Sequence, residues 1–348
     1  MRQNLKWISK ALSARWAATL GVTLAIGVFA ASGPACAGDK RLEGKVSIDG
    51  SSTVYPITEA MAEEFRTPQP KVRVTVGISG TGGGFKKFCA GETVISDASR
   101  PIKSSEVAAC KAAGIDYIEL PVAFDGLSVV VSTANTWASA LTVDELRKIW
   151  RQGDKMAKLW SDVRPNWPKE SIRLYGPGTD SGTFDYFVEA IVGDAKEGHF
   201  IRPDFTASED DNVLVQGIAG DRYSLGFFGF AYYVENQDKL KAIKIDGGKG
   251  PVGPSMETIN NGTYSPLSRP LFIYVSTKAA DRPEVKSFVT FYLDNATKLV
   301  PQVGYVPLPA KAYDLVRERF AKHKTGSLFH GVEVGMKIED ILSREHGS

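Results

Sequence analysis

The sequence predicts an α/β protein in which two lobes enclose a ligand cleft. The first observation is a recurring unit, in which a short apolar strand leads into a loop rich in glycine and hydroxyl residues and then into a helix. Ligands of such folds bind beyond the carboxyl ends of the strands, where these loops lie. The second observation is a pair of apolar strands, near 127–133 and 270–276, that bracket the middle third of the chain. Such strands would carry the chain from one lobe to the other and back, which predicts a cleft between the lobes.

The N-terminal segment, residues 1–37, has the pattern of a secretory signal. Four basic residues precede an apolar run over 17–31, and residues 35–37 form a small-x-small cleavage site. The run is too short and too rich in alanine and glycine for a good membrane span. Lipidation of Cys36 is the alternative, but the residues before it lack the usual aliphatic position. We therefore predict cleavage after Ala37.

Charge and composition exclude several classes of protein. The full chain of 348 residues carries a net charge of +2, and the signal holds four positive charges and no negative one, so the mature chain carries +2 − 4 = −2. A slightly acidic secreted protein lacks the basic clusters that nucleic acid binding needs. The four histidines are scattered, with no cluster of cysteine, histidine and aspartate at metal-ligand spacing. We expect no nucleic acid partner, no metal and no cofactor.

Two cysteines, Cys89 and Cys110, remain after the signal is removed. An even number of cysteines in an oxidising compartment predicts a disulfide. Two buried free thiols are the alternative.

The first three units of strand, loop and helix come early in the chain. The first has a strand at 45–49, a loop at 50–55 and a helix from Pro56. The second has a strand at 72–76, a loop at 79–84 and a helix from Phe85. The third has a strand at 93–95, a loop at 96–101 and a helix near Ser104. The loop 79–84 is not a P-loop, because no Gly-Lys-Ser/Thr follows, and not a dinucleotide fingerprint, because Phe85 replaces the third glycine. Arg100 in the third loop is placed to grip an anion, and a surface salt bridge with Asp97 is the alternative.

The fourth unit has the clearest chemistry for an anion. A strand at 171–175 turns through 176–178 and offers Asp180, Ser181 and Thr183 at the start of an apolar helix. A helix N-terminus leaves backbone N–H groups unpaired and carries a partial positive charge, and small residues let an anion approach. Capping of the helix by Asp180 or Ser181 is the simpler alternative. The recurrence of this chemistry along the chain favours an oxyanion site.

The remaining elements continue the α/β pattern. Further strands are expected at 116–121, 126–133, 224–228, 240–246 and 269–276. Further helices are expected after Thr142, after the acidic stretch 208–212, from 229 and through most of the chain beyond Pro283.

Four loop stretches, and a weaker fifth, also carry a likeness to a known family. They are residues 49–57, 77–85, 97–102 and 180–184, with the weaker match at 224–232. Together they resemble the periplasmic phosphate-binding protein of bacterial high-affinity phosphate ABC transporters. Each motif is weak alone, but four in order at helix starts behind a signal peptide are specific.

The resemblance implies the type II periplasmic binding protein fold, whose two lobes close on the ligand by a hinge. Residues 38–126 and 273–348 would form lobe I, and residues 127–272 would form lobe II. The implied function is capture of inorganic phosphate in the periplasm and delivery to the membrane permease of an ABC transporter. The implied protein is a monomer without enzymatic activity.

The resemblance also implies a set of ligand groups. The family holds dehydrated phosphate by backbone N–H groups and hydroxyls at helix N-termini, with one arginine and one acid. The amides and hydroxyls fall on Ser52, Thr53, Val54, Tyr55, Ser79, Thr81, Ser181, Gly182 and Thr183.

Two positions depart from the family pattern. Pro177 stands where the best-known members have the arginine, and Ser99 stands where they have the acid. Arg100 is the natural substitute for the arginine. The acid stays open among Asp97, Asp180, Glu209, Asp210 and Asp211.

The acid matters because phosphate carries a proton near neutral pH and sulfate does not. A buried carboxylate accepts a hydrogen bond from the protonated ligand, but it faces a sulfate oxygen as a second acceptor, which is costly without water.

Three other functions remain as alternatives. A binding protein for sulfate, molybdate or tungstate would use the same helix N-termini without the acid. A hydrolase with Ser181 as nucleophile is disfavoured, because Gly178 and Gly182 do not flank the serine as in a nucleophile elbow. A structural surface protein would explain neither the glycine loops nor the hinge-like strands.

Overall fold

The computed structural model describes residues 41–179, 181–193, 195–329 and 336–344. The predicted signal and its cleavage site lie outside these residues, as does Asp180. Within the described ranges, no helix has both the length and the hydropathy that crossing a bilayer requires.

Most strands belong to one mixed sheet. In spatial order it holds β2 (Val72–Ile78), β1 (Gly44–Gly50), β3 (Ile95–Ala98), β12 (Ser268–Ser276), β4 (Tyr117–Ser132), β8 (Ser224–Gly229), β6 (Arg173–Gly176) and β7 (Thr206–Ala207), and β9 (Leu240–Ala242) also pairs with β4. A small second sheet has the order β11 (Pro251–Val252), β10 (Lys244–Asp246) and β5 (Ala140–Thr142). The strands β1, β2 and β3 are mutually parallel, whereas β12 runs antiparallel to both β3 and β4.

Strand β4 is the element that connects the two parts of the sheet. The sequence predicted two strands, 116–121 and 126–133, and this was wrong, because a single strand of 16 residues is buried along its whole length. Its first half pairs with β12, with Ser276 opposite Tyr117 and Ser268 opposite Gly126. Its second half pairs with β8 and β9. The residues between the two predicted strands stay extended because β12 continues to pair with them.

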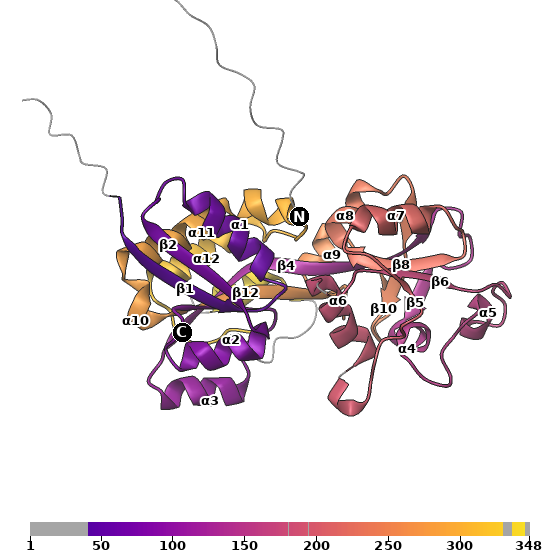
Figure 1. Ribbon diagram of the computed structural model, residues 1–348, viewed down its shortest axis with the longest axis horizontal. Coiled ribbons are helices and arrows are strands. Elements are labelled where there is room, and N and C mark those ends of the chain that lie inside the picture. Colours follow the sequence, from indigo (N-terminus) through magenta and orange to yellow (C-terminus); the bar gives the residue numbers. More distant parts are fainter. Residues whose placement is uncertain (1–40, 180, 194, 330–335, 345–348) are drawn as a thin grey trace, which may run out of the picture. The chain divides into compact units, whose positions relative to one another are not determined.

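The helices form two groups, one at each end of the paired strands β4 and β12 (Figure 1). The first group holds α1 (Tyr55–Phe65), α2 (Gly80–Cys89), α3 (Ser104–Ala112), α10 (Thr277–Ala280), α11 (Pro283–Gln302), α12 (Ala310–Ala321) and α13 (Ile338–Ser343). The second group holds α4 (Val143–Trp150), α5 (Trp160–Val163), α6 (Gly182–Phe187), the π-helix η1 (Val188–Val192), the 3-10 helix η2 (Ala195–Glu197), α7 (Asp211–Ala219), α8 (Phe230–Glu235) and α9 (Met256–Asn260).

The described chain therefore has the two-lobed arrangement that was predicted. Helices α1 and α11 pack on the β1 side of the sheet, and α7 packs on β8 at the other end. We keep the names lobe I and lobe II with the boundaries given above, which remain a prediction. Strands β4 and β12 run side by side from one lobe to the other, so the segment between the lobes is the natural place for a hinge.

The predicted disulfide is confirmed. It joins Cys89 at the end of α2 to Cys110 on α3, with 4.3 Å between the two Cα atoms. The alternative of two free thiols is therefore wrong. The disulfide fastens α3 to the helix that follows the glycine-rich loop.

One boundary prediction near the glycine-rich loop was wrong. Helix α2 begins at Gly80 and not near Phe85, so most of the predicted loop 79–84 forms the first turns of the helix. Ser79 stands at the N-cap position. The backbone there is helical because α2 packs closely on β1 and β3, where glycines leave room for the neighbouring backbone.

Candidate functional site

Three of the predicted loops leave the same edge of the sheet. At this edge Gly50 of β1 pairs with Ile78 of β2 on one side and with Asp97 of β3 on the other. The N–H of Ser51 donates to the carbonyl of Asp97 at 3.0 Å, and the N–H of Ser79 donates to the carbonyl of Gly50 at 3.2 Å. Parallel strands thus bring the loops after β1, β2 and β3 together, as the sequence predicted for their carboxyl ends.

The fourth loop comes from lobe II and meets the first loop across the cleft. A Cβ built on Gly182 would lie 2.8 Å from Cα of Thr53, so only glycine allows this approach. The hydroxyl of Ser52 donates to Oδ2 of Asp185 on α6 at 3.2 Å. The structure therefore describes the two lobes in contact at this point.

Ser181 caps helix α6, as the simpler alternative proposed. Its Oγ accepts a hydrogen bond from the N–H of Thr183 at 3.2 Å. Capping uses a lone pair of the hydroxyl and leaves its hydrogen available to donate. Capping and anion binding are therefore compatible at this residue.

The predicted groups at the start of α1 are already engaged with their own loop. The N–H of Thr53 donates to Oγ of Ser51 at 3.2 Å, and the N–H of Tyr55 donates to the carbonyl of Ser51 at 3.0 Å. The Tyr55 hydroxyl donates to Glu59 at 2.6 Å. Val54 is fully buried at the N-cap position of α1. These bonds hold the loop in a fixed shape against the end of the sheet.

The hydroxyls of the second and third loops make two separate sets of hydrogen bonds. The Ser79 hydroxyl donates to Oδ1 of Asp49. Thr81 and Ser99 share a hydrogen bond between their hydroxyls at 3.1 Å, and the N–H of Ser99 donates to Oγ1 of Thr81 at 3.2 Å. The structure thus brings Thr81 and Ser99 together although 18 residues separate them.

Arg100 has a partner that the sequence analysis did not name. Its guanidinium makes two hydrogen bonds to Glu106, at 2.9 and 2.8 Å, in place of the salt bridge with Asp97 considered above. Burial alone would raise the pKa of Glu106, but the bonds from Arg100 and from the N–H of Lys103 lower it. The guanidinium also lies near the first turn of α2, 3.9 Å from where a Cβ on Gly82 would stand. Arg100 is therefore beside the N-terminus of α2.

Asp97 lies on β3, where it pairs with Gly50 of β1, and it is completely buried. Among the described residues, neither of its carboxylate oxygens has a hydrogen-bond partner. Burial raises its pKa to about 8, the nearby Thr58 hydroxyl partly offsets this, and the Asp49 carboxylate adds to it. Asp97 does not line the cavity described next, so the geometry does not place it with the other predicted acids.

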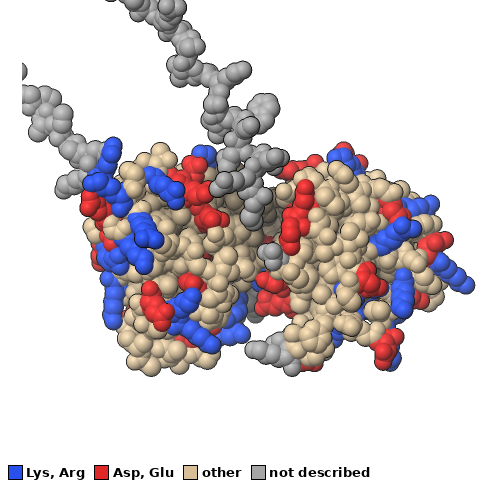
Figure 2. All heavy atoms as spheres, viewed as in Figure 1, with Lys and Arg blue, Asp and Glu red and all other residues tan. Residues whose placement is uncertain are grey.

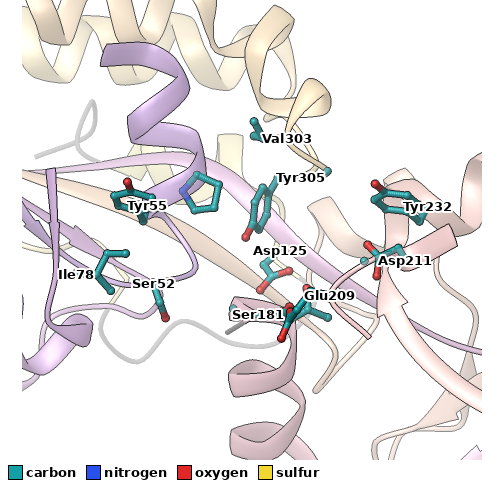
Figure 3. Close-up of a pocket in the computed structure, with 15 residues that line it drawn as sticks. Ser52, Tyr55, Ile78, Asp125, Ser181, Glu209, Asp211, Tyr232, Val303 and Tyr305 are labelled. Atoms are coloured by element: carbon teal, nitrogen blue, oxygen red, sulfur yellow. Dashed lines mark hydrogen bonds between the residues drawn. The ribbon is translucent and has the colours of Figure 1, made fainter. Parts of the chain in front are cut away.

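A cavity of about 390 Å³ lies between the first and fourth loops (Figure 3). Lobe I contributes Ser52, Tyr55, Pro56, Ile78, Asp125, Val303, Gly304 and Tyr305; lobe II contributes Ser181, Gly182, Thr183, Glu209, Asp211, Gly229 and Tyr232. In the view of Figure 3, the side chains of Ser181 and Glu209 overlap, and Asp125 is drawn between them and Tyr305.

Three carboxylates give the cavity an acidic wall. Burial raises the pKa of Asp125 to about 6, against the opposing effect of Arg269. Burial also raises the pKa of Asp211 to about 6, and the neighbouring acids Asp210 and Glu209 add to the shift. Glu209 contacts the loop before Ser181, because a Cβ on Gly178 would overlap its carboxylate. Figure 2 shows acidic side chains at the edges of the hollow between the lobes.

The acidic stretch 208–212 has a structural role at the start of α7. Oδ1 of Asp210 accepts from the N–H of Asn212 at 2.9 Å and so caps the helix. Asp210 is therefore engaged as a cap, whereas Glu209 and Asp211 on either side of it line the cavity.

Arg269 was not among the residues predicted from the sequence. This residue begins the apolar part of β12, and its guanidinium contacts Thr53, Asp125 and Glu189. The only signal was an arginine at the edge of an apolar strand, which has many ordinary explanations. Its partners became visible only once β4 and β12 were paired.

The fold and the loops together are those of a binding protein, and comparisons with known proteins agree. Residues 35–296 match the family model described as a PBP superfamily domain. The chain belongs to this superfamily.

Relatives within it are similar over most of their length. Protein SphX of Synechococcus elongatus is 55% identical over 303 residues, which cover 86% of this chain and 88% of the relative. The phosphate-binding protein PstS of Staphylococcus saprophyticus is 39% identical, covering 84% of this chain and 89% of the relative. A solved structure, titled a possible phosphate binding protein from Planctomyces limnophilus, has a TM-score of 0.77 at 50% identity and covers 81% of this chain and 99% of its own.

Proposed function

We propose that this chain is a solute-binding protein that captures inorganic phosphate in the periplasm and delivers it to the permease of an ABC transporter. The observation that carries the proposal is that three hydroxyl-bearing loops of lobe I leave the same end of the sheet, and that the fourth, from lobe II, contacts the first of them. Relatives that share more than a third of the sequence are named phosphate-binding proteins. The predicted signal peptide supports the location.

The proposed ligand groups are the loop residues that the sequence singled out. Helix N-termini supply donors to an oxyanion without burying a full positive charge. They are complemented by the hydroxyls of Thr53, Thr81, Ser99, Ser181 and Thr183 and by the guanidinium of Arg100. The hydroxyls of Ser52 and Ser79, which here donate to Asp185 and Asp49, would turn to the ligand when it binds. Arg100 remains paired with Glu106 while its other face lies beside α2, which limits the net charge brought to the ligand.

For the acid that accepts the proton of phosphate, we propose Glu209. It lines the cavity, as Ser181 does, and its carboxylate contacts Gly178 in the turn that leads to Ser181. Among the other open candidates, Asp97 does not line the cavity, Asp210 caps α7, and Asp180 lies outside the described residues. Asp211 lines the cavity too, but it is Glu209 that contacts the turn before Ser181.

The test is titration calorimetry of the mature protein, freed of bound ligand, with phosphate and then with sulfate. Binding of phosphate without heat from sulfate supports the proposal. The Glu209→Gln variant should then bind phosphate more weakly and discriminate less against sulfate, whereas the neighbouring Asp210→Asn should change stability more than selectivity. Binding of sulfate, molybdate or tungstate by the wild type would instead assign the same site to another oxyanion.

A hydrolase has less support from the site. None of the residues that line the cavity is a histidine, so none of them is an imidazole base for Ser181. Turnover of a chromogenic phosphate ester by the purified protein would reverse this conclusion.

A further inference from the structure

Arg269 lies on β12, where this strand runs beside β4 from one lobe to the other. It lies directly opposite Asp125 in the register of β12 and β4. The two side chains form an ion pair at 3.4 Å, and they are only 13% and 3% exposed. The charge of the guanidinium is therefore balanced within the paired strands, so Arg269 does not serve as a free cation for the ligand.

The guanidinium contacts both lobes at once. Nη2 donates to Oγ1 of Thr53 in lobe I at 3.1 Å. Nη1 donates to Oε2 of Glu189 on η1 in lobe II at 3.0 Å. The guanidinium carbon also lies 3.7 Å from the ring centroid of Tyr186 on α6. One planar side chain thus joins the first loop of lobe I to the helix that carries the fourth loop.

The contact with Thr53 has a chemical consequence. An arginine side chain only donates hydrogen bonds, so the threonine oxygen must accept and its hydroxyl hydrogen is left for another acceptor. That oxygen is 3.1 Å from where a Cβ on Gly182 would stand, at the N-terminus of α6. An oxyanion held by α6 would be the acceptor within reach of the Thr53 hydroxyl.

We propose that Arg269 is a positioning residue for anion binding: it orients the Thr53 hydroxyl toward the ligand and holds the two lobes together around it. This inference depends on the proposed function, because it needs an oxyanion at the start of α6. Arginine suits the role because its planar group can lie on an aromatic ring while its nitrogen atoms donate in several directions. A lysine has one charged nitrogen and would satisfy only part of this arrangement.

The experiment is a double-mutant cycle on phosphate affinity, with Arg269→Met, Thr53→Val and the double variant, measured by titration calorimetry. Arg269→Met should raise the Kd for phosphate about ten-fold or more, because a charge-assisted hydrogen bond to the ligand-facing hydroxyl is lost. Its dissociation rate should rise, since the lobes are less firmly joined. If Arg269 acts through Thr53, the double variant should bind no more weakly than the weaker single variant.

Two further variants keep the test decisive. Arg317→Met removes another bridging arginine, which joins α12 to α11 through Asp294, and should leave the Kd unchanged. Arg269→Lys retains the charge beside Asp125 and should give an intermediate Kd, which provides the measurement if Arg269→Met does not fold.

The outcomes distinguish a failure of the proposed function from a failure of the positioning role. A wild-type protein that binds no phosphate overturns the proposed function itself. A wild type that binds phosphate, with an unchanged Kd in the Arg269 variants or with fully additive effects in the cycle, overturns only the positioning role.

Discussion

Two arginine–carboxylate pairs lie near the proposed site, and they differ in how far along the chain each reaches. Arg100 and Glu106 are six residues apart and belong to one loop and the helix after it. Arg269 and Asp125 are 144 residues apart and meet only because β4 and β12 pair. The first pair organises a loop inside lobe I, whereas the second stands where the lobes connect and contacts both.

The difference also appears in the protonation of the two acids. Glu106 accepts two hydrogen bonds from Arg100 and another from a backbone N–H, and its pKa is lowered despite partial burial. Asp125 is buried with one long contact to Arg269, and its pKa is raised to about 6. A salt bridge therefore stabilises the charged carboxylate only where hydrogen bonds replace the water that burial removes.

The largest expected effect is the loss of phosphate affinity when Arg100 is removed from the Arg100–Glu106 pair. Arg100→Ala should weaken phosphate binding by about 3 kcal/mol, because it removes a charge-assisted contact in a partly buried site. Titration calorimetry of the variant measures the loss. An affinity equal to that of the wild type would remove Arg100 from the site and leave Arg269 as the arginine that matters there.

Reduction of the disulfide tests whether the Arg100–Glu106 pair depends on the covalent link between α2 and α3. Reduction of Cys89–Cys110, which closes a loop of 21 residues, should lower the free energy of unfolding by about 3 kcal/mol. The phosphate affinity should stay nearly unchanged, because the Arg100–Glu106 bonds join a loop and helix adjacent in the chain. Urea unfolding and calorimetry with and without reductant provide both quantities. Loss of binding where the reduced fold persists would show that the separation is wrong.

The fourth loop offers an intermediate effect that involves neither arginine. Ser181→Ala and Thr183→Ala should each weaken phosphate binding by about 1–3 kcal/mol through lost buried hydrogen bonds. Ser181→Ala should also cost about 1 kcal/mol of stability, because the cap of α6 is lost. Calorimetry and thermal unfolding of both variants separate the two contributions. Equal stability of the two variants would argue against the cap.

The smallest expected effects concern pH and have opposite signs in the two pairs. The stabilisation from Glu106 is present above its ordinary pKa of 4.5 and is lost as the pH falls through its lowered value. The stabilisation from neutral Asp125 is present below its ordinary pKa of 3.8, and it is lost as the pH rises through its raised pKa of about 6. Between pH 4 and 7, Glu106→Gln should therefore become more destabilising relative to the wild type and Asp125→Asn less so, each by on the order of 1 kcal/mol. Urea unfolding across this range measures both, and parallel trends would contradict the contrast drawn above.

Much of the fold could be predicted from the sequence because its signals are local. The hydroxyl loops, the helix after Ser181 and the cysteine pair each depend on residues close together or on simple counting. The predictions that were wrong also have a local cause. The continuous strand β4 looked like two strands, since pairing with β12 across its middle cannot be seen in one segment. Helix α2 began earlier than expected because its glycines are held in a helix by packing against β1 and β3.

The candidate site was predictable in the same uneven way. The structure brings two pairs of predicted residues together, Thr53 with Gly182 and Thr81 with Ser99, and their role in binding stays a prediction. Arg269 was not found, because nothing in its own neighbourhood distinguishes it from any arginine at the end of a strand. The acid stayed open for a related reason, since only the structure shows that Glu209 and Asp211 line the cavity and that Asp97 does not.

By itself, the sequence determined the α/β class, the disulfide and the kind of chemistry that the loops offer, because these follow from residue types at short spacing. The tertiary structure alone decided which loops meet, which acids are buried and which arginine joins the lobes. Those outcomes depend on strand register and burial, where residues more than a hundred positions apart become neighbours and lose their contact with water.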